Sequence, residues 1–394
     1  VGGVAVGERG GRRVVEVPAR LLTTDAGELV DDPEIEIVVE LMGGVDRAYD
    51  FIRSAVAAGK AVVTGNKALL AERGEEIFRM ASDRRTPVYF EAAVAGGIPI
   101  IMALREALVG NHIVSIHGIL NGTCNYILTR MHEEGGEFGE VLEDAKRLGY
   151  AEADPTLDVS GWDAAHKAII LASLSYGFWV GTRQVSVAGI ERVTPEDMRF
   201  ADSLGYAIKH LAVIRADEQG EVEVQVEPTL IPAGHLLASV DGVFNAVAVT
   251  GNVVGETVFY GRGAGQDPTA SAVISDLAEA ARALDAPGST FGFTPHGLYL
   301  NCKPPSEIVS QYYLRLLVED RPGVLAQVAS VLGEHRIGIS SVIQPEVGEA
   351  ERVPLVMMLH DASGAGMQSA SAAIAALECV TGEPVVFRVD HLDL

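Results

Sequence analysis

The 394-residue sequence has few cysteines and no long apolar run. Only three cysteines occur, Cys124, Cys302 and Cys379, and their spacing suits neither a disulfide framework nor a zinc site. No stretch of about 18 apolar residues is present, and no signal peptide is recognisable. We therefore expect a cytoplasmic protein, rather than a disulfide-stapled secreted domain or a membrane protein.

Basic residues are also in short supply. Thirty Lys and Arg stand against 54 Asp and Glu, which gives a formal charge of −24 and a pI near 4.8. This balance argues against binding to nucleic acid or to a membrane surface. A halophilic surface and an ordinary soluble surface both fit it. The length and the 48% hydrophobic content suggest two or three domains with real cores.

A glycine-rich phosphate loop is missing from the start of the sequence. The stretch 1–7 is a short apolar strand that runs into a loop rich in Gly and Arg. Its glycines do not make the dinucleotide fingerprint, which needs a strand before the glycines and a helix after them.

The next 90 residues alternate strands with helices. Apolar runs at 35–41, 61–64 and 88–90 predict strands, and 49–58 and 71–82 predict helices. Such alternation is typical of an α/β fold with a doubly wound parallel sheet, which binds ligands at the carboxyl ends of its strands. The residues expected at those ends are Gly43, Gly44, Thr64, Asn66 and Lys67.

An acidic stretch, residues 149–167, carries the main chemical signal. Its charged side chains are those of Glu152, Asp154, Asp158, Asp163 and Lys167. Pro155 disfavours helix for the residue before it, so 152–158 is predicted to be a loop. Ser160 followed by Asp163 matches a capping box, which predicts a helix start there.

Two interpretations of this stretch remain open. Asp163 and Lys167 lie four residues apart on one helix face, so they can simply form a cap and a salt bridge. Alternatively, the four acids offset their repulsion with a substrate ammonium group and Lys167. A lysine held in such a place can have its pKa tuned for proton transfer.

The pattern Gly-Tyr-Ala-Glu-x-Asp-Pro, followed by Asp-x-x-Gly-x-Asp-x-x-x-Lys, resembles the signature of homoserine dehydrogenases. The resemblance implies hydride transfer between a nicotinamide cofactor and the homoserine/aspartate-semialdehyde pair, in threonine, methionine and isoleucine biosynthesis. It implies that Lys167 is the proton donor, and that Lys67 and Asp163 are the other catalytic residues. The implied substrate-binding residues are Glu152 for the amine, Asp158, Asp163 and Tyr150 in the amino-acid pocket, and Gly122 and Thr123 for the carboxylate.

The resemblance covers nearly the whole chain except its start. The first strand, glycine loop and helix of the family are absent, and 1–6 resembles the family's second strand. We therefore expect weaker NADPH binding and lower stability than in a complete enzyme. A chain extended by one strand–loop–helix unit of about 30 residues should restore both.

The resemblance also assigns cofactor and metal positions. Lys67 becomes a second active-site lysine, although a surface lysine is an equally simple interpretation. The turn with Gly263 and Gly265 lies beside the cofactor, or else is a plain lead-in to the helix 268–285. Arg9, with Arg12 and Arg13, favours NADP over NAD, whereas Glu8 would suit NAD. A monovalent cation, expected to be sodium, is held by the glutamate and carbonyls that match Glu91, Val94, Gly96 and Ile98.

The C-terminal part, 311–394, reads as strand, helix, strand, strand, helix, strand, and resembles an ACT regulatory domain, which implies a ferredoxin-like fold. Threonine is the implied effector, bound at the turn that contains Asp320, Gly323, Val324 and Leu325. The other predicted boundaries are a nucleotide-binding domain at 1–95, completed by the helix 268–285, a catalytic and dimerisation domain at 96–267, and a linker at 286–310. The family's antiparallel sheet implies a homodimer or homotetramer.

Two other functions remain open from the sequence. Cys124 would be the thiolate nucleophile of an aspartate-semialdehyde dehydrogenase, but no histidine can be placed beside it from sequence, and a buried cysteine is usually inert. A chain without turnover could instead act as an amino-acid-binding module through its ACT-like part.

Overall fold

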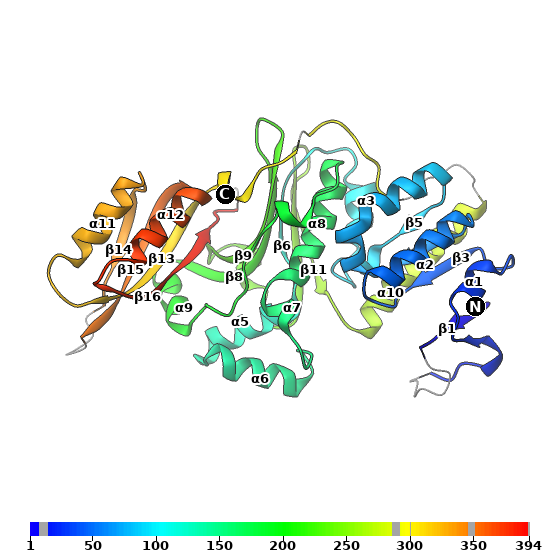
Figure 1. Cartoon of the computed structure of the whole chain (residues 1–394), viewed down its shortest axis with the longest axis horizontal. Helices are drawn as coiled ribbons and strands as arrows, with labels where there is room; N and C mark the ends of the chain where they lie inside the picture. Colours follow the sequence, from blue (N-terminus) through cyan, green and yellow to red (C-terminus); the bar gives the residue numbers. More distant parts are fainter. Residues whose placement is uncertain (8–14, 286–291, 300, 346–350, 393–394) are drawn as a thin grey trace. The chain divides into compact units, whose positions relative to one another are not determined.

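The computed structural model describes residues 1–7, 15–285, 292–299, 301–345 and 351–392. These residues form two compact units (Figure 1). The first comprises Val1–Gly110, Ile169–Thr182 and Arg262–Leu298, and the second comprises Asn111–Ala168, Arg183–Gly261 and Tyr299–Leu394. Within the described ranges, every helix falls short of the length and apolar character needed to cross a membrane.

The first unit is an α/β domain, as predicted. Its longer sheet has the parallel order β3-β4-β5, and a separate parallel pair joins β1 to β2. All four residues of β4 are buried, as expected for a strand covered on both faces. The strands are β1 (Val4–Ala5), β2 (Leu22–Thr23), β3 (Ile37–Glu40), β4 (Ala61–Thr64) and β5 (Val88–Tyr89).

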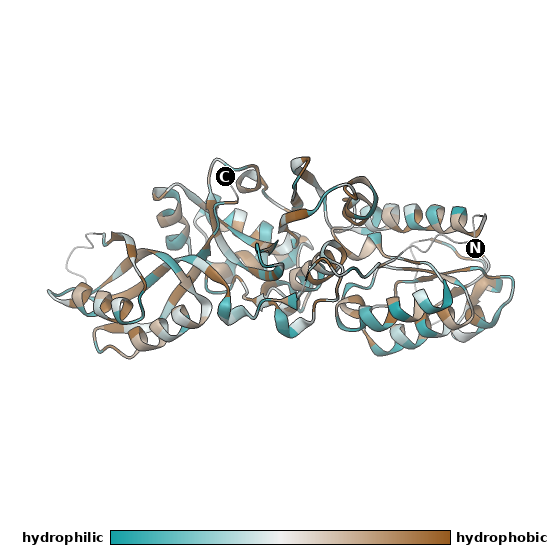
Figure 2. Ribbon diagram, turned by 90° about the horizontal axis from the view of Figure 1, so that it is seen from above, coloured by the Kyte–Doolittle hydropathy of each residue, from teal (hydrophilic) through white to brown (hydrophobic). Residues whose placement is uncertain are grey.

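Amphipathic helices cover this sheet. Along α2 the buried positions are Ala48, Ile52, Ala55 and Val56, which recur at helical spacing. The ribbons of these helices change between hydrophilic and hydrophobic along their length (Figure 2). The helices of the unit are α1 (Gly27–Asp31), α2 (Asp46–Ala57), α3 (Lys67–Arg84), α4 (Ile100–Met102) and α10 (Gln266–Asp285). Val273 and Ala280 of α10 pack on β4 and β5.

The described strands of the second unit form one 11-stranded sheet. Its path is β11-β10-β6-β8-β9-β16-β13-β15-β14, with β7 and β12 added to β9. The pairs β10–β6, β6–β8 and β8–β9 are antiparallel, whereas β7 pairs with β9 in parallel. The strands of this part are β6 (Ile113–Ile119), β7 (Ser186–Val187), β8 (Tyr206–Ala216), β9 (Glu221–Pro232), β10 (Phe244–Gly251) and β11 (Gly255–Arg262). Its helices are α5 (Gly122–Glu134), α6 (Phe138–Leu148), α7 (Thr156–Val159) and α9 (Pro195–Ser203). The helix α8 (Trp162–Tyr176) begins in this unit, and its residues from Ile169 onward belong to the first.

The rest of the sheet belongs to a C-terminal subdomain, residues 309–389, whose order β16-β13-β15-β14 matches the predicted ferredoxin-like fold. Its elements, orange to red in Figure 1, are β13 (Val309–Glu319), α11 (Val324–Glu334), β14 (Ile339–Ile343), β15 (Arg352–Ser363), α12 (Gly364–Ala375) and β16 (Val380–Val389). The strand β12 (Asn301–Cys302) and a 3₁₀ turn lie within the predicted linker. The predicted domain boundaries stay a prediction.

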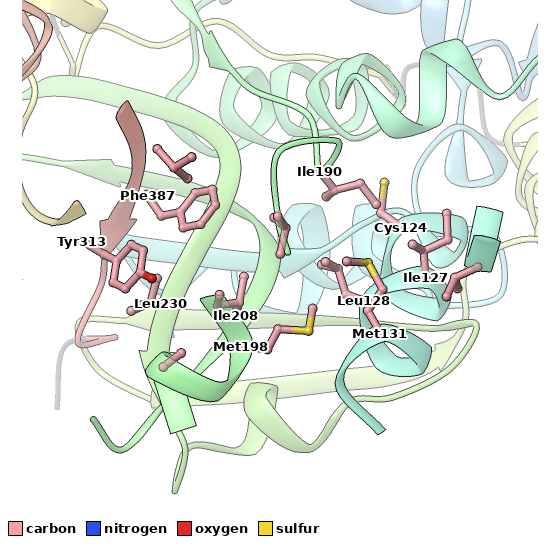
Figure 3. Close-up of a cluster of buried hydrophobic side chains, with 14 of the residues drawn as sticks. Cys124, Ile127, Leu128, Met131, Ile190, Met198, Ile208, Leu230, Tyr313 and Phe387 are labelled. Atoms are coloured by element: carbon pink, nitrogen blue, oxygen red, sulfur yellow. The ribbon is translucent and has the colours of Figure 1, made fainter. Parts of the chain in front are cut away.

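The C-terminal subdomain and the antiparallel part of the sheet share a core. Arg388 and Val389 of β16 pair in parallel with Thr229 and Leu230 of β9. One buried cluster joins Tyr313 and Phe387 of the subdomain to residues of α5 and α9 (Figure 3). Hydrogen bonding and apolar packing therefore both cross the boundary between these parts.

Charged side chains also cross that boundary. The Asp197 carboxylate, fully buried in α9, accepts hydrogen bonds from the Tyr313 hydroxyl at 2.8 Å and from Arg315 Nε at 2.5 Å. Arg388 donates through Nε to Glu227 of β9 at 2.9 Å. Buried charges paired in this way resist separation of the two parts.

Two local predictions were wrong, although a helix does start at the predicted place, with Trp162. Asp158 lies in the short helix α7 rather than in a loop, because a proline can open a helix as well as end one. Ser160 ends α7 and does not cap α8, since the left-handed conformation of Gly161 (φ +89°) separates the two helices. Farther back in the chain, α4 is a single turn that is followed by a π-helical segment, Ala103–Ala107.

Candidate active site

A cluster of buried polar side chains in the second unit surrounds Lys167. Its Nζ donates at 2.7 Å to the Asp163 carboxylate and at 2.7 Å to the Leu120 carbonyl. Both charged side chains are largely buried, and each residue is 8% exposed. An ammonium has three N–H donors, so these two bonds leave a third direction in which Lys167 can meet a ligand.

Asn121 joins this pair to a second carboxylate. Its Nδ2 donates to Asp158 at 2.7 Å and to Asp163 at 2.8 Å. Its Oδ1 accepts the Cys124 amide at 2.7 Å and so caps α5. Because Asn121 directly follows Leu120 at the end of β6, a single strand-to-helix turn holds both the lysine and the acids.

Asn121 and Leu120 were not predicted as site residues. The family resemblance assigned roles only to the next two residues, Gly122 and Thr123. An asparagine just before a helix start is a capping signal that could have singled it out. The role of the Leu120 carbonyl had no signal in the sequence, because it depends on tertiary packing.

The other predicted substrate residues lie on the loop before α7 and at the start of α5. The Thr123 hydroxyl donates to the Tyr150 carbonyl at 2.7 Å, and the Tyr150 ring packs on Tyr126 with centroids 4.7 Å apart. Thr123 therefore ties the α5 N-terminus to this loop. Glu152 is exposed and follows that anchor by two residues.

Cys124 does not behave as a nucleophile. The thiol is fully buried and its Sγ donates to the Asp158 carbonyl at 3.1 Å. Burial, with Asp158 and Asp163 nearby, raises the pKa of Cys124 well above its ordinary value. A nucleophilic cysteine needs the opposite, a lowered pKa and access to solvent. The thioester alternative is therefore not favoured.

In the first unit, the predicted cofactor residues gather at the carboxyl ends of β3 and β4. Asn66 donates through Nδ2 to the Gly44 carbonyl at 2.7 Å and caps α3 through Oδ1. The Thr64 hydroxyl donates at 2.7 Å to the buried carboxylate of Glu40, which was not predicted as a site residue. Lys67 is the first residue of α3, and Gly43 (φ +72°) lies in the turn after β3.

A second glycine turn lies against the loop 94–98. The Gly97 amide donates to the Arg262 carbonyl at 3.1 Å. A Cβ on Gly96 would come within 2.6 Å of the Gly263 carbonyl, so only glycine allows this approach. Gly265 (φ +122°) then leads into α10. The predicted metal loop and the predicted cofactor turn are thus neighbours in one unit.

An apolar hollow of about 510 Å³ opens beside this turn. Its lining consists of Leu41, Gly265, Gln266, Thr269, Ala270, Val273 and Ile274. It therefore joins the end of β3 to the first turns of α10. Arg9, with Glu8, Arg12 and Arg13, lies outside the described residues.

The predicted cation ligand Glu91 is engaged by the protein itself. Its carboxylate accepts the Ile101 and Met102 amides at 2.9 and 2.8 Å, and its own amide donates to Asp276 at 2.9 Å. Burial raises the pKa of Glu91, and burial also raises the pKa of Asp276 to about 7. A cation beside this acid pair would favour the ionised forms, and carboxylate and carbonyl oxygens suit a hard cation.

The predicted effector turn is well formed in the C-terminal subdomain. Gly323 (φ +91°) precedes α11, whose first residues are Val324 and Leu325. Asp320 is exposed, and Gln344 donates to its carboxylate at 3.3 Å. Because the first amides of a helix have no intrahelical partner, this turn can receive an anionic group.

Comparison with known proteins gives consistent matches along the chain. The family model described as homoserine dehydrogenase matches residues 99–278, that of its NAD-binding domain residues 1–91, and that of the ACT domain residues 312–379. A homoserine dehydrogenase of Pseudomonas aeruginosa is 47% identical over 378 residues, which cover 94% of this chain and 87% of that protein.

Solved structures of homoserine dehydrogenases also match this chain. A homoserine dehydrogenase from Thiobacillus denitrificans matches with a TM-score of 0.89 and 44% identity, over 94% of this chain and 86% of that one. A hyperthermophilic archaeal homoserine dehydrogenase in complex with NADPH matches with a TM-score of 0.58 and 32% identity, over 67% of this chain and 76% of that one.

Proposed function

Because the chain belongs to the homoserine dehydrogenase family, an NAD(P)-dependent oxidoreductase family, we propose that Lys167 exchanges the hydroxyl proton in the interconversion of homoserine and aspartate 4-semialdehyde. The supporting observation is the geometry of Lys167, with two of its three N–H donors bonded to Asp163 and Leu120. The third donor is the one that we assign to the substrate oxygen.

In aldehyde reduction, Lys167 gives a proton to the carbonyl oxygen as that oxygen becomes the hydroxyl. In homoserine oxidation, the neutral amine takes that proton back. Asp163 holds Nζ in place and balances its charge, and Asn121 keeps Asp163 and Asp158 together. We keep Lys67, the first residue of α3 in the first unit, as a second proposed active-site lysine that would polarise a carbonyl oxygen. The nicotinamide, when bound, exchanges hydride with the carbinol carbon.

The residues Gly43, Thr64, Asn66, Gly263 and Gly265 are our proposed cofactor contacts, because they border the strand ends and the hollow at α10. We favour NADP, in line with the NADPH that the archaeal relative binds. Steady-state oxidation of homoserine with NAD and with NADP tests both the reaction and the preference. No turnover with either cofactor would contradict the proposal.

We further propose that sodium is held by Glu91 and the carbonyls of Val94, Gly96 and Ile98. The buried acid pair Glu91–Asp276 supports it, since an added positive charge would relieve the cost of burying two carboxyl groups. The Ile98 carbonyl also accepts the Ile100 amide at 2.8 Å. In this position a cation would supply charge balance and rigidity to the loop.

The family membership also supports proposals for the oligomeric state, the pathways and the compartment. We propose a homodimer or homotetramer formed through the antiparallel sheet. The proposed pathways are those of threonine, methionine and isoleucine. The cytoplasm is the proposed compartment, since all three cysteines are thiols in the structure.

We expect Glu152→Gln to raise KM for homoserine far more than KM for the cofactor. The glutamine keeps the shape of the side chain but removes the charge that pairs with the substrate ammonium. Such a charge-assisted interaction typically strengthens binding about 10-fold or more. Steady-state kinetics with each substrate varied in turn measures both constants. Asp154→Asn is the matched control on the same exposed loop, and an increase confined to cofactor KM would refute the substrate assignment.

We also propose threonine as the effector, bound at the turn 320–325. Gly323→Ala should abolish threonine binding, because alanine is strained at φ +91° and would distort the start of the helix. Gly333→Ala, in α11 with open space around it, is the control and should bind normally. Calorimetry on the full chain with millimolar threonine measures both. Absence of heat with the unmodified chain would count against this effector.

A further inference from the structure

In the second unit, near the Lys167 cluster, one buried asparagine has a side chain without a hydrogen-bond partner among the described residues. Asn245 of β10 is 1% exposed, and among the described residues neither its Oδ1 nor its Nδ2 has a partner. A buried carboxamide without hydrogen bonds destabilises the folded state, because its desolvation is not compensated. Such a group needs either an internal water or a ligand.

The position of Asn245 favours a ligand. The pairing of Ala246 with Ile119 places Asn245 opposite Leu120, whose carbonyl binds Lys167. A Cβ built on Gly122 would lie 3.5 Å from Asn245 Oδ1, so the carboxamide lies beside the first residue of α5. Asn245 therefore lies beside the N-terminus of a 13-residue helix, and opposite the residue whose carbonyl binds Lys167.

Two features of the α5 N-terminus point to an anion. The Gly122 and Thr123 amides have no intrahelical acceptor, because they belong to the first turn, and the helix dipole adds positive potential there. A Cβ on Gly122 would also come within 2.7 Å of the Val243 carbonyl, so the chain approaches β10 as closely as glycine allows.

The surroundings hold Asn245 in place. Asn125 Nδ2 donates to the carbonyls of Val240, Gly242 and Phe244 at 3.0, 3.1 and 3.2 Å, which fastens α5 to the start of β10. A binding group held by such supporting contacts needs little ordering when the ligand arrives. Because neither Oδ1 nor Nδ2 of Asn245 has a hydrogen-bond partner among the described residues, the carboxamide can turn its Nδ2 toward a negative group.

We propose that Asn245 is a substrate-binding residue that recognises the α-carboxylate of the amino-acid substrate, together with the Gly122 and Thr123 amides. This inference rests on the proposed function and extends it by a residue that no sequence pattern singled out. A zwitterionic substrate suits these assignments, because Glu152 is the proposed partner of the ammonium and amide donors are the proposed partners of the carboxylate. Asn245 thus selects amino acids over simple hydroxy-amines.

The test is calorimetric binding of L-homoserine to the full chain and to its Asn245→Leu variant. We expect the variant to bind homoserine about 10- to 100-fold more weakly, as for loss of a hydrogen bond to a charged group. The preference for homoserine over its carboxamide, homoserinamide, should fall in the same proportion. Gln225→Met, at another buried amide of the same sheet with an unpaired oxygen, is the control and should bind like the unmodified chain.

Thermal unfolding of each variant separates binding from folding. Asn245→Leu should be as stable as the unmodified chain or more so, because an unsatisfied polar group is removed. If leucine does not fit, the smaller Asn245→Ala provides the same comparison. Unchanged homoserine affinity and unchanged carboxylate preference would overturn the inference and leave an asparagine solvated by internal water. Turnover of homoserine by the unmodified chain, measured in parallel, tests the proposed function separately.

Discussion

Lys167→Ala should lower kcat for homoserine oxidation by about 10²–10⁴-fold, the usual contribution of a positioned proton-transfer group. The variant removes the amine that the structure places on Asp163 and on the Leu120 carbonyl. Stopped-assay or continuous measurement of NADPH formation gives kcat, and circular dichroism checks that the fold is retained.

Lys209→Ala is a closely matched control. Lys209 is also buried, and its Nζ also donates to one backbone carbonyl, of Val240 at 2.7 Å, and one carboxylate, of Asp241 at 3.0 Å. Any loss of activity from removing a buried lysine as such should appear in both variants. A Lys167→Ala protein that retained more than about a tenth of kcat would remove Lys167 from the proposed role.

Asp197→Ala should cost about 3–5 kcal/mol in the free energy of unfolding, the range for breaking one partner out of a buried ion pair. The substitution leaves the Arg315 guanidinium without its carboxylate and Tyr313 without its acceptor. It also removes the capping box with Thr194 that begins α9. Urea unfolding followed by fluorescence measures the change.

Arg192→Ala gives the contrasting case at the same boundary. Arg192 pairs with Glu383 of the C-terminal subdomain at 2.7 Å, but the two side chains are 56% and 80% exposed. Solvent screens such a pair, so the loss should stay below about 1 kcal/mol. Equal effects of the two substitutions would show that burial of the Asp197 network contributes nothing to stability.

Patterns confined to a few residues were predicted well from the sequence. The run Ala61–Thr64 is uniformly apolar up to its last residue, and β4 is buried throughout. The spacing of Asp163 and Lys167 placed them on one helix face, where they are bonded. The βαββαβ order of the C-terminal subdomain was also visible from its alternating patterns. In each case a period of two or 3.6, or a single run, carries the information.

Features that depend on distant parts of the chain were missed. Most of β8 is buried on both faces, so its residues do not alternate in polarity and no strand was predicted there. Asp197 meets Arg315 across 118 residues of sequence, and no local pattern links them. Asn245 reads as an ordinary polar residue until its register against Leu120 is known.

The described strands of the second unit form a single sheet, which limits where the chain can be divided into separately folding parts. Cutting the chain before β13 would strip β16 from β9 and expose Tyr313 and Phe387, which now lie in a shared core (Figure 3). The C-terminal subdomain is therefore poorly suited to transfer by itself into another enzyme, because its unpaired strand edge would promote aggregation. When this subdomain is exchanged between relatives, α9 and β9 should be exchanged with it. The transferred segment then keeps both sides of the contact between the subdomain and the rest of the unit.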